Sequence, residues 1–573
     1  MLRVQAVPRM FVAGILAMGC ASAANIGGLL VDAAHGDDRS TVAALLERGA
    51  DANAVSADGS TALAWAAIRG NSAVARLLLA AGANPDLANA YGVVPVSLAI
   101  ENGAAEVARL LLENGADPNV ERGNGETALM TALRLGQIDM VKQLLRHGAD
   151  PNAREKRFGQ TALMWAAGNP DAVRLLLDSG ADVNVVTRTW NVKYTVYIPT
   201  SFTLGKTGIP WNADGEYTSK RGGQTALFFA IRKRDLESAR MLLDAGLDVK
   251  DLASDGTSPL LAALYNWVPL DSDFQPGQGA PARAGSSQRF APNIDMAHIL
   301  LDRGVSATAA DTAGYTPLHA AALAVAWVSR RQDSRSDGVY RTLPALLTLD
   351  RPPKPPPFDR IDALGMVRRL LDAGADPNRQ TKYPTPGPDG DVRINPSPPG
   401  SSALHIAASS SSLDLVKMLL DAGADPNLVR KDGHTPFSVA VVARDMPVLE
   451  ELIMRGADLQ ARYDPHDMYP DPIKAVSLPR QGQSIVHIAA GNRSPKVVEY
   501  LHAKGAPIDW KNKQGETPLD LGDHQERFQE SLNRQNTDGD PERLKKVVRP
   551  TETTDAIKKL LNERKKLAGT DGP

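Results

Sequence analysis

The histidines of this sequence that could act as bases or metal ligands recur at one position of a repeated pattern. His319, His405 and His487 each stand three residues after a Thr or Ser, in Thr-Pro-Leu-His, Ser-Ala-Leu-His and Ser-Ile-Val-His. An active site needs a unique constellation of side chains, whereas a residue that recurs in register has the same structural task in each copy. We therefore interpret these histidines as structural. The same argument assigns a turn role to the recurring aspartates, which are Asp51, Asp117, Asp150, Asp182, Asp376, Asp425 and Asp458.

Two unique stretches are similar to ligand-binding loops, but each lacks residues that the chemistry requires. Gly205-Lys206-Thr207 ends like a phosphate-binding loop, yet Thr200 stands where the first glycine is needed. Asn536–Asp540 is similar to part of a calcium loop, but Arg534 falls at its first ligand position and Lys545 at its last. Neither stretch therefore predicts a nucleotide or calcium site.

One cluster of metal-ligating residue types stands in a stretch that contains several prolines. Asp464, His466, Asp467 and Asp471 supply carboxylates and an imidazole, which are ligands for divalent metals. The alternative is a solvated loop, and the absence of a second histidine nearby favours it. We expect no metal, no cofactor and no catalytic residue, so the predicted protein is not an enzyme. An enzyme or metal-dependent site in the insertions is the alternative.

The repeated unit is a pair of short helices, seen most clearly in residues 124–152. Thr127 predicts the start of the first helix, because its hydroxyl can accept hydrogen bonds from free N–H groups. Gly136 predicts its end, since glycine adopts the left-handed conformation at a helix C-terminus most easily. A second helix, ending at Gly148, has four apolar residues on one face: Ile138, Val141, Leu144 and Leu145. So small a unit cannot bury this face alone and must pack against copies of itself.

The unit recurs with a constant period. The glycine after the second helix stands at Gly49, Gly82, Gly115 and Gly148, and each step (82−49, 115−82 and 148−115) is 33 residues. This period, with the helix start Gly314-Tyr-Thr-Pro-Leu-His-Ala-Ala321 and its partial copies, resembles the ankyrin repeat. The resemblance covers nearly all of residues 25–525 in about twelve units. It implies an all-α solenoid of stacked helix-turn-helix units with hairpin loops, in which the recurring histidine bonds to a neighbouring unit.

Breaks in the period divide the chain. Regular repeats with an N-terminal capping unit are predicted for residues 24–186, and further repeats for 223–525. A hairpin-like insertion is predicted for 187–222, because apolar and mostly polar residues alternate over Trp190–Ile198 with the period of a strand. Residues 526–573 are expected to be a C-terminal tail with a capping helix. Four loop insertions are expected in the second set of repeats, near 267–293, 328–360, 381–400 and 462–482.

Residues 1–23 have the three parts of a secretory signal peptide. A basic start precedes an apolar run from Met10 to Cys20, and Ala21-Ser22-Ala23 follows as a cleavage site. We therefore expect a bacterial-type exported protein, periplasmic or secreted, with its mature N-terminus at Ala24. The alternative is a lipid anchor at Cys20, which would place a lipoprotein on the membrane surface. Ala17 makes this alternative weaker, because such sites prefer leucine at that position.

Composition narrows the classes of function. The chain has 64 basic and 66 acidic residues and a net charge of −2, whereas a domain that binds nucleic acid is expected to be basic. No segment after the N-terminal run is a continuous apolar stretch long enough for a membrane-spanning helix. We therefore expect a protein partner, no nucleic acid and no transmembrane segment.

The resemblance places partner binding on the concave face, which hairpin tips and first helices form. We predict a protein-binding scaffold in the bacterial cell envelope that recognises its partner through this face and the inserted loops; a lipid-anchored structural scaffold is a further alternative. The residues at the matching positions are Tyr91, Val93, Asn124, Glu126, Arg134, Phe158, Gln160, Lys431 and His434. The insertion 187–222 adds Trp190, Tyr194, Trp211 and Tyr217, aromatic residues of the kind that anchor protein interfaces. Alternatively, these aromatics pack on the solenoid.

Overall fold

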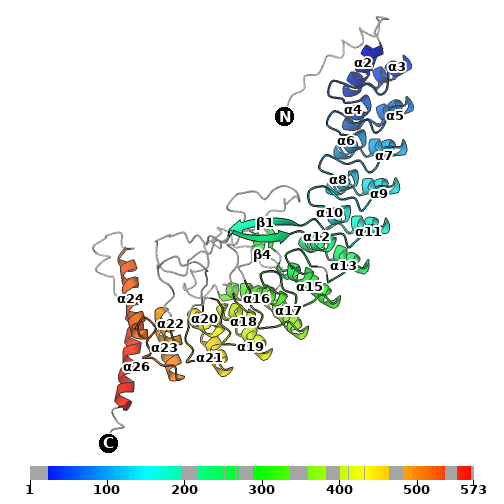
Figure 1. Cartoon of the computed structure of the whole chain (residues 1–573). Helices are drawn as coiled ribbons and strands as arrows, with labels where there is room; N and C mark the ends of the chain where they lie inside the picture. Colours follow the sequence, from blue (N-terminus) through cyan, green and yellow to red (C-terminus); the bar gives the residue numbers. More distant parts are fainter. Residues whose placement is uncertain are drawn as a thin grey trace. The chain divides into compact units, whose positions relative to one another are not determined.

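In the computed structural model, helices make up nearly all of the regular secondary structure of the described residues (Figure 1). The residues that it describes are 23–195, 216–250, 252–265, 267–269, 288–290, 292–333, 359–382, 400–410, 412–431, 433–463, 482–535 and 551–568. Within these ranges, no helix combines the length and apolar character that crossing a membrane requires. The chain divides into two compact units: Met1–Trp190 with Lys220–Val249, and Asn191–Ser219 with Lys250–Pro573.

The first unit is a stack of antiparallel helix pairs. Its first helices pack against one another, and its second helices do the same. Figure 1 accordingly shows the even-numbered helices α2 to α10 in one row and the odd-numbered helices α3 to α11 in another. The pairs are α2 (Ala23–His35) with α3 (Arg39–Glu47), α4 (Ala62–Arg69) with α5 (Ser72–Ala80), α6 (Pro95–Glu101) with α7 (Ala105–Glu113), α8 (Ala128–Arg134) with α9 (Ile138–Arg146), α10 (Ala162–Ala166) with α11 (Pro170–Asp178), and α12 (Ala226–Lys233) with α13 (Leu236–Asp244).

The second unit repeats this arrangement. Its first helices from α14 to α24 again pack on one another in order. The pairs are α14 (Pro259–Leu264) with α15 (Ile294–Asp302), α16 (Pro317–Asp333) with α17 (Arg360–Asp372), α18 (Ala403–Ser409) with α19 (Leu413–Asp421), α20 (Pro436–Ala443) with α21 (Met446–Met454), α22 (Ile485–Gly491) with α23 (Pro495–Ala503), and α24 (Pro518–Gln535) with α26 (Glu552–Ala568). The predicted all-α solenoid of stacked helix-turn-helix units is confirmed.

The helix signals of the repeat act as predicted in the pair α8 and α9, with one difference. Thr127 is the N-cap of α8, where its hydroxyl accepts a hydrogen bond from the N–H of Met130. Leu144 is fully buried, which places its side chain in the apolar interior between helices. Leu145, however, is only half-buried. Met140 completes the buried face of α9 in its place, because the face of this helix turned to the core is centred on Val141 and Leu144.

A side-chain amide links neighbouring repeats at five of the described turns that follow a second helix. Asn152 donates from Nδ2 to the carbonyl oxygen of Gly180 at 3.0 Å, and its Oδ1 accepts from the N–H of Asp182 at 2.8 Å. The residue four after the turn glycine makes the same pair of bonds at Asn53, Asn119, Asn378 and Asn427. These amides fix the spacing of neighbouring repeats by satisfying backbone groups that helix ends leave without partners.

The recurring histidines are structural, as predicted, and the bonds across units are present. In each case Nδ1 lies within hydrogen-bonding distance of the hydroxyl that begins the helix, at 2.7–2.9 Å. Nε2 then meets a carbonyl oxygen of a later repeat: His319 pairs with Ser401 at 3.1 Å, and His487 with Glu516 at 3.0 Å. Both ring nitrogens are therefore occupied, and none of these histidines is free to bind a metal or move a proton.

Two short sheets interrupt the helix pairs. Strands β1 (Trp190–Thr195) and β2 (Glu216–Arg221) form one two-stranded sheet, so the strand predicted from the alternation at 190–198 is present up to Thr195. Strands β3 (Trp267–Pro269) and β4 (Gln288–Phe290) form an antiparallel pair between α14 and α15.

One predicted insertion boundary is wrong. The insertion expected from residue 328 begins later, because α16 continues to Asp333. The extension is explained by a run of small and apolar residues from Ala320 to Val328, most of whose members are buried. The insertions expected at 381–400 and 462–482 leave the stack between Thr381 and Gly400 and between Tyr463 and Gln483, where backbone bonds of 2.7 and 2.8 Å connect the two ends.

The N-terminus of the C-terminal helix α26 is hydrogen-bonded to a buried carboxylate of α24. Glu526 of α24 is 1% exposed, and Oε1 accepts from the N–H groups of Thr553 and Thr554 at 3.0 and 3.1 Å. Its Oε2 accepts from the Thr554 hydroxyl at 2.7 Å. A negative charge at this position complements the positive end of the helix dipole. The predicted C-terminal capping helix is present, with Ile557 fully buried.

Candidate functional site

The part of the chain that the structure describes has no group of three or more His, Cys, Asp or Glu side chains arranged to bind a metal. The predicted cluster of Asp464, His466, Asp467 and Asp471 lies outside the described residues, as do the phosphate-loop-like stretch 205–207 and the calcium-loop-like stretch 536–540. The candidate site therefore has to be found on the surface of the repeats.

Large apolar side chains that remain exposed gather in the turns between one repeat and the next. Tyr91 is 80% exposed and Trp190 40% exposed, although burying such side chains stabilises a fold substantially. The others in these turns are Val55, Val186, Leu252 and Val429, whereas Leu135, Ile361 and Met454 lie at helix ends. The turns between repeats thus present apolar side-chain surface that is not buried in the packing of the repeats.

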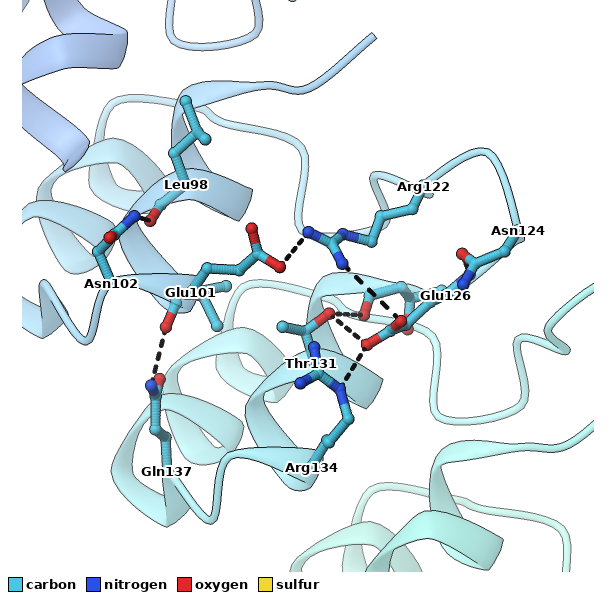
Figure 2. Close-up of polar contacts among 11 residues, drawn as sticks. Leu98, Glu101, Asn102, Arg122, Asn124, Glu126, Thr131, Arg134 and Gln137 are labelled. Atoms are coloured by element: carbon cyan, nitrogen blue, oxygen red, sulfur yellow. Dashed lines mark hydrogen bonds and ion pairs between the residues drawn. The ribbon is translucent and has the colours of Figure 1, made fainter. Parts of the chain in front are cut away.

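The turn before α8 is held by a polar network on the inner helices (Figure 2). Glu126 is 6% exposed, and its Oε1 accepts from Nε of Arg134 at 3.1 Å and from the Thr131 hydroxyl at 3.0 Å. Arg122 lies between two carboxylates, paired with Glu101 and 4.0 Å from Oε2 of Glu126. The network balances two arginines against two glutamates, so it carries little net charge.

This network changes the interpretation of two predicted binding residues. Glu126 is buried, so a partner cannot reach it without opening the turn. Arg134 uses its guanidinium to pair with Glu126, and the pair positions α8 beneath the turn. Asn124 and Arg134 are both exposed. The Oδ1 of Asn124 accepts from the N–H of Glu126 at 3.0 Å, and its carbonyl accepts from the N–H of Lys156 at 3.0 Å.

The next turn along the stack is shaped by a second buried carboxylate. Glu155 accepts from the N–H groups of Arg157 and Phe158, both at 2.6 Å, and of Gln160 at 3.1 Å. The predicted residues Phe158 and Gln160 are therefore half-buried members of one tight loop. Three charge-assisted bonds to backbone N–H groups hold this loop in a single conformation.

An aromatic pair with a cation above it forms the outer surface of this loop. The rings of Phe158 and Trp190 are 5.1 Å apart and tilted by 51°, a spacing typical of favourable aromatic pairs. The guanidinium carbon of Arg157 lies 4.7 Å from the centre of the Phe158 ring, within the range of a cation–π interaction. The structure thus brings the predicted Phe158 and Trp190 together although they are separated by a full repeat in the sequence.

The remaining predicted residues are dispersed. Tyr91 and Val93 lie in the turn before α6, where Tyr91 projects into solvent and Val93 is half-buried. In the second unit, Lys431 donates to the carbonyl oxygen of Lys382 at 3.0 Å, and Nδ1 of His434 lies 2.9 Å from the Ser438 hydroxyl. Trp211 and the side chains of Tyr194 and Tyr217 lie outside the described residues.

The basic residues around the aromatic pair were missed by the sequence reasoning. Arg154, Arg157 and Arg188 are exposed beside Phe158 and Trp190. The signal was present in the stretch Arg154-Glu-Lys-Arg-Phe158, a turn with more charge than the corresponding turns. The sequence could not show that Arg188, from the following turn, would join it.

Some turn junctions of the second unit lack the linking asparagine, and one of them encloses a cavity. Thr308 stands where the linking asparagine is found elsewhere, and its hydroxyl pairs with Ser306 at 3.0 Å within its own repeat. A cavity of about 250 Å³ lies at this junction, lined by Ala307, Thr308, Thr316, Ala375, Asp376 and Arg379. Arg379 and Asp376 give it both signs of charge.

Stacked helix pairs, turn glycines and bonds between consecutive repeats define an α-solenoid built of nearest-neighbour contacts. The model of the family of ankyrin repeats matches residues 29–122, 114–187 and 361–463, so the chain contains ankyrin repeats. Ankyrin repeats are generally scaffolds for protein–protein interaction and are typically non-catalytic. A comparison with curated proteins finds no match.

Proposed function

We propose that this protein is an exported scaffold that binds a protein partner through the turns and first helices of its first unit. One observation carries the proposal, namely the gathering of exposed apolar side chains in the turns between repeats. Four of them, Val55, Tyr91, Val186 and Trp190, belong to the first unit. Exposed aromatic residues on a rigid framework are frequent anchors of protein interfaces, and partner binding is the general role of the family.

Affinity capture with matched variants tests this proposal. The full chain is immobilised, an extract from its own cells is passed over it, and retained proteins are identified by mass spectrometry. Tyr91→Ala and Trp190→Ala should each reduce retention of the partner, because truncating an interface anchor costs about 2 kcal/mol or more of binding free energy. Ile361→Ala is the control, since Ile361 is 78% exposed but lies on α17 in the second unit.

The result can contradict the proposal in two ways. If both first-unit variants retain the same proteins as the original chain, the partner does not use these turns. If Ile361→Ala reduces retention of the partner as strongly as Tyr91→Ala does, the retained proteins bind exposed apolar residues non-specifically. Thermal unfolding of every variant shows whether a loss of retention follows from a loss of structure.

Export is the second part of the proposal and rests on the pattern of residues 1–23, which lie outside the described residues apart from Ala23. We propose a periplasmic or secreted location. N-terminal sequencing of native protein should find Ala24 first. A lipid-modified Cys20 would instead place the scaffold on a membrane surface, and an intact Met1 would contradict export.

A further inference from the structure

We infer that the first unit binds an acidic peptide segment at one place, which we name the arginine–aromatic corner. It consists of Arg154, Arg157, Phe158, Arg188 and Trp190. The inference rests on the proposed function and deepens it, because it states the chemistry of the partner segment. Carboxylates of that segment would pair with the guanidinium groups, and an apolar side chain beside them would lie against the two rings.

The three arginines of the corner form no ion pair with a described residue of the protein. Among the residues that the structure describes, no carboxylate oxygen lies within 4 Å of the guanidinium groups of Arg154, Arg157 or Arg188. Arg154 donates instead to the carbonyl oxygens of Gly159 at 3.2 Å and Val186 at 2.5 Å. These bonds position the Arg154 guanidinium group, and because carbonyl oxygens are neutral acceptors, they do not cancel its positive charge.

The same holds for the neighbouring arginine. Arg188 donates from Nη1 to the carbonyl oxygen of Lys156 at 2.6 Å, and its own N–H donates to the Phe158 carbonyl at 2.7 Å. The side chains of Arg154 and Arg188 therefore connect the two consecutive turns. Guanidinium groups with spare N–H donors are the preferred partners of carboxylates, because their planar geometry allows two parallel bonds.

The other turns of this unit provide the contrast. Arg122, one turn earlier, is paired with Glu101 and lies near Glu126, so its charge is already balanced. The turn before that, residues 89–93, has no charged side chain. Exposed aromatic and uncompensated positive groups therefore coincide at one place among the described turns of the unit.

The corner is also rigid, which favours specific binding. Glu155 lies beneath it and accepts three backbone N–H groups, as described above. Gly159 adopts a φ of +67°, and a Cβ there would lie 2.8 Å from Cγ of Arg188, so only glycine lets the two turns approach this closely. A surface that is ordered before binding loses less conformational entropy on association.

An acidic peptide fits this place better than a nucleic acid does. The chain as a whole has a net charge of −2, and long polyanions require extended basic surfaces. The neighbouring Lys156 does not extend the basic surface, because Glu121 lies 3.2 Å from its Nζ. The chain's own insertion is a poor occupant, because residues 196–215 contain one lysine and one aspartate and offer no excess negative charge.

A direct binding assay tests the inference with the full chain. The probe is a short fluorescein-labelled peptide of Asp and Glu residues around a central Leu-Phe, measured by fluorescence anisotropy at low and at physiological salt. A matched peptide with Asn and Gln in place of the acids, and a single-stranded DNA of equal net charge, are the comparison probes. We expect the acidic peptide to bind and its affinity to fall with salt, as charge pairing requires.

Arg157→Glu is the decisive variant. The Arg157 side chain contacts the Phe158 ring and makes no hydrogen bond in the described part of the chain, so its replacement leaves the turns connected. We expect an affinity loss of about tenfold or more for the acidic peptide. Arg146→Glu is the matched control, because Arg146 is an exposed arginine at the end of α9, outside the corner. This variant should bind the peptide as tightly as the original chain does.

Each result supports or overturns the inference. It is overturned if Arg157→Glu binds the acidic peptide as tightly as the original chain, if the Asn/Gln peptide binds equally well, or if the DNA binds more tightly than the peptide. A partner that is captured from cells equally by the original chain and by Arg157→Glu would leave the proposed scaffold function standing and refute the corner as its acidic-segment site.

Discussion

Asn152 lies across a repeat boundary from Gly180, with its amide nitrogen 3.0 Å from the glycine carbonyl oxygen. The amide oxygen of the same side chain accepts from the N–H of Asp182. One residue therefore satisfies both a free acceptor and a free donor of the following turn. Because the same geometry recurs at Asn53 and Asn119, the spacing of the first unit is fixed by a line of amides as well as by apolar packing.

Asn152→Ala should lower the stability of the first unit by about 1–2 kcal/mol, because a protein hydrogen bond contributes about 0.5–1.5 kcal/mol net and two are lost. Urea unfolding followed by circular dichroism measures the effect. Asn102→Ala is the control, since Asn102 donates to the Leu98 carbonyl of its own helix. Equal effects of the two variants would show that the bonds between repeats are no more important than bonds within one.

Leu144→Ala should cost about 2–5 kcal/mol, as expected for a fully buried leucine whose removal leaves a cavity. Leu145→Ala should cost clearly less, about 1 kcal/mol, because the half-buried side chain withdraws less apolar area from water. Comparing the denaturation midpoints of these two variants tests the helix register directly. A larger loss for Leu145→Ala would mean that the orientation of α9 is different from that described.

The fold could be predicted from the sequence because its signals are local and recur. Thr127 begins a helix and Gly148 ends one through bonds within a few residues, and repetition makes each signal visible many times. Predictions failed where burial depends on neighbouring repeats. The alternation of apolar residues around α9 does not by itself distinguish Leu145 from Met140, and nothing local shows that α16 continues past Val328.

The candidate site was harder to predict for a related physical reason. The positions of Tyr91 and Trp190 follow from the repeat pattern, and both are exposed. Whether a charged residue at such a position is available depends on its partners, which come from other turns. Glu126 matches the pattern of a contact residue, yet it is buried and paired with Arg134. The Arg157 guanidinium, by contrast, has no carboxylate oxygen within 4 Å in the described structure.

Glu526→Gln should loosen the C-terminal helix α26. The carboxylate accepts from three donors at the start of that helix, while a glutamine amide has a single acceptor oxygen and no charge. Hydrogen bonds to charged groups contribute about 1.5–3 kcal/mol, so protection of residues 552–568 in hydrogen-exchange mass spectrometry should fall. Glu563→Gln, at an exposed position of the same helix, is the control and should leave this protection unchanged.

The repeat that begins with α16 contains two groups whose pKa values are shifted in opposite directions by burial, the half-buried Asp311 and the buried His319. Burial raises the pKa of Asp311 from 3.8 to about 7, although its Oδ1 accepts from the N–H of Tyr315 at 2.8 Å. Burial also lowers the pKa of His319 from 6.5 to about 4, against the opposing effect of its bond to the Ser401 carbonyl. The folded state therefore favours the neutral form of both groups.

Asp311→Asn should therefore stabilise the second unit at neutral pH and lose this advantage in acid. The folded state binds the Asp311 proton more tightly than the unfolded state, so the stability that this group contributes is fully present below pH 3.8 and is lost as the pH rises towards about 7. Asparagine keeps an oxygen for the Tyr315 N–H and has no charge to bury. His319 acts in the other direction, because its contribution is present above pH 6.5 and is lost as the pH falls towards about 4.

Urea unfolding of the original chain and of Asp311→Asn across this pH range measures the difference in stability between them, in which the contribution of His319 cancels. The difference should grow with pH; a constant difference would show that Asp311 is ionised in the folded protein throughout.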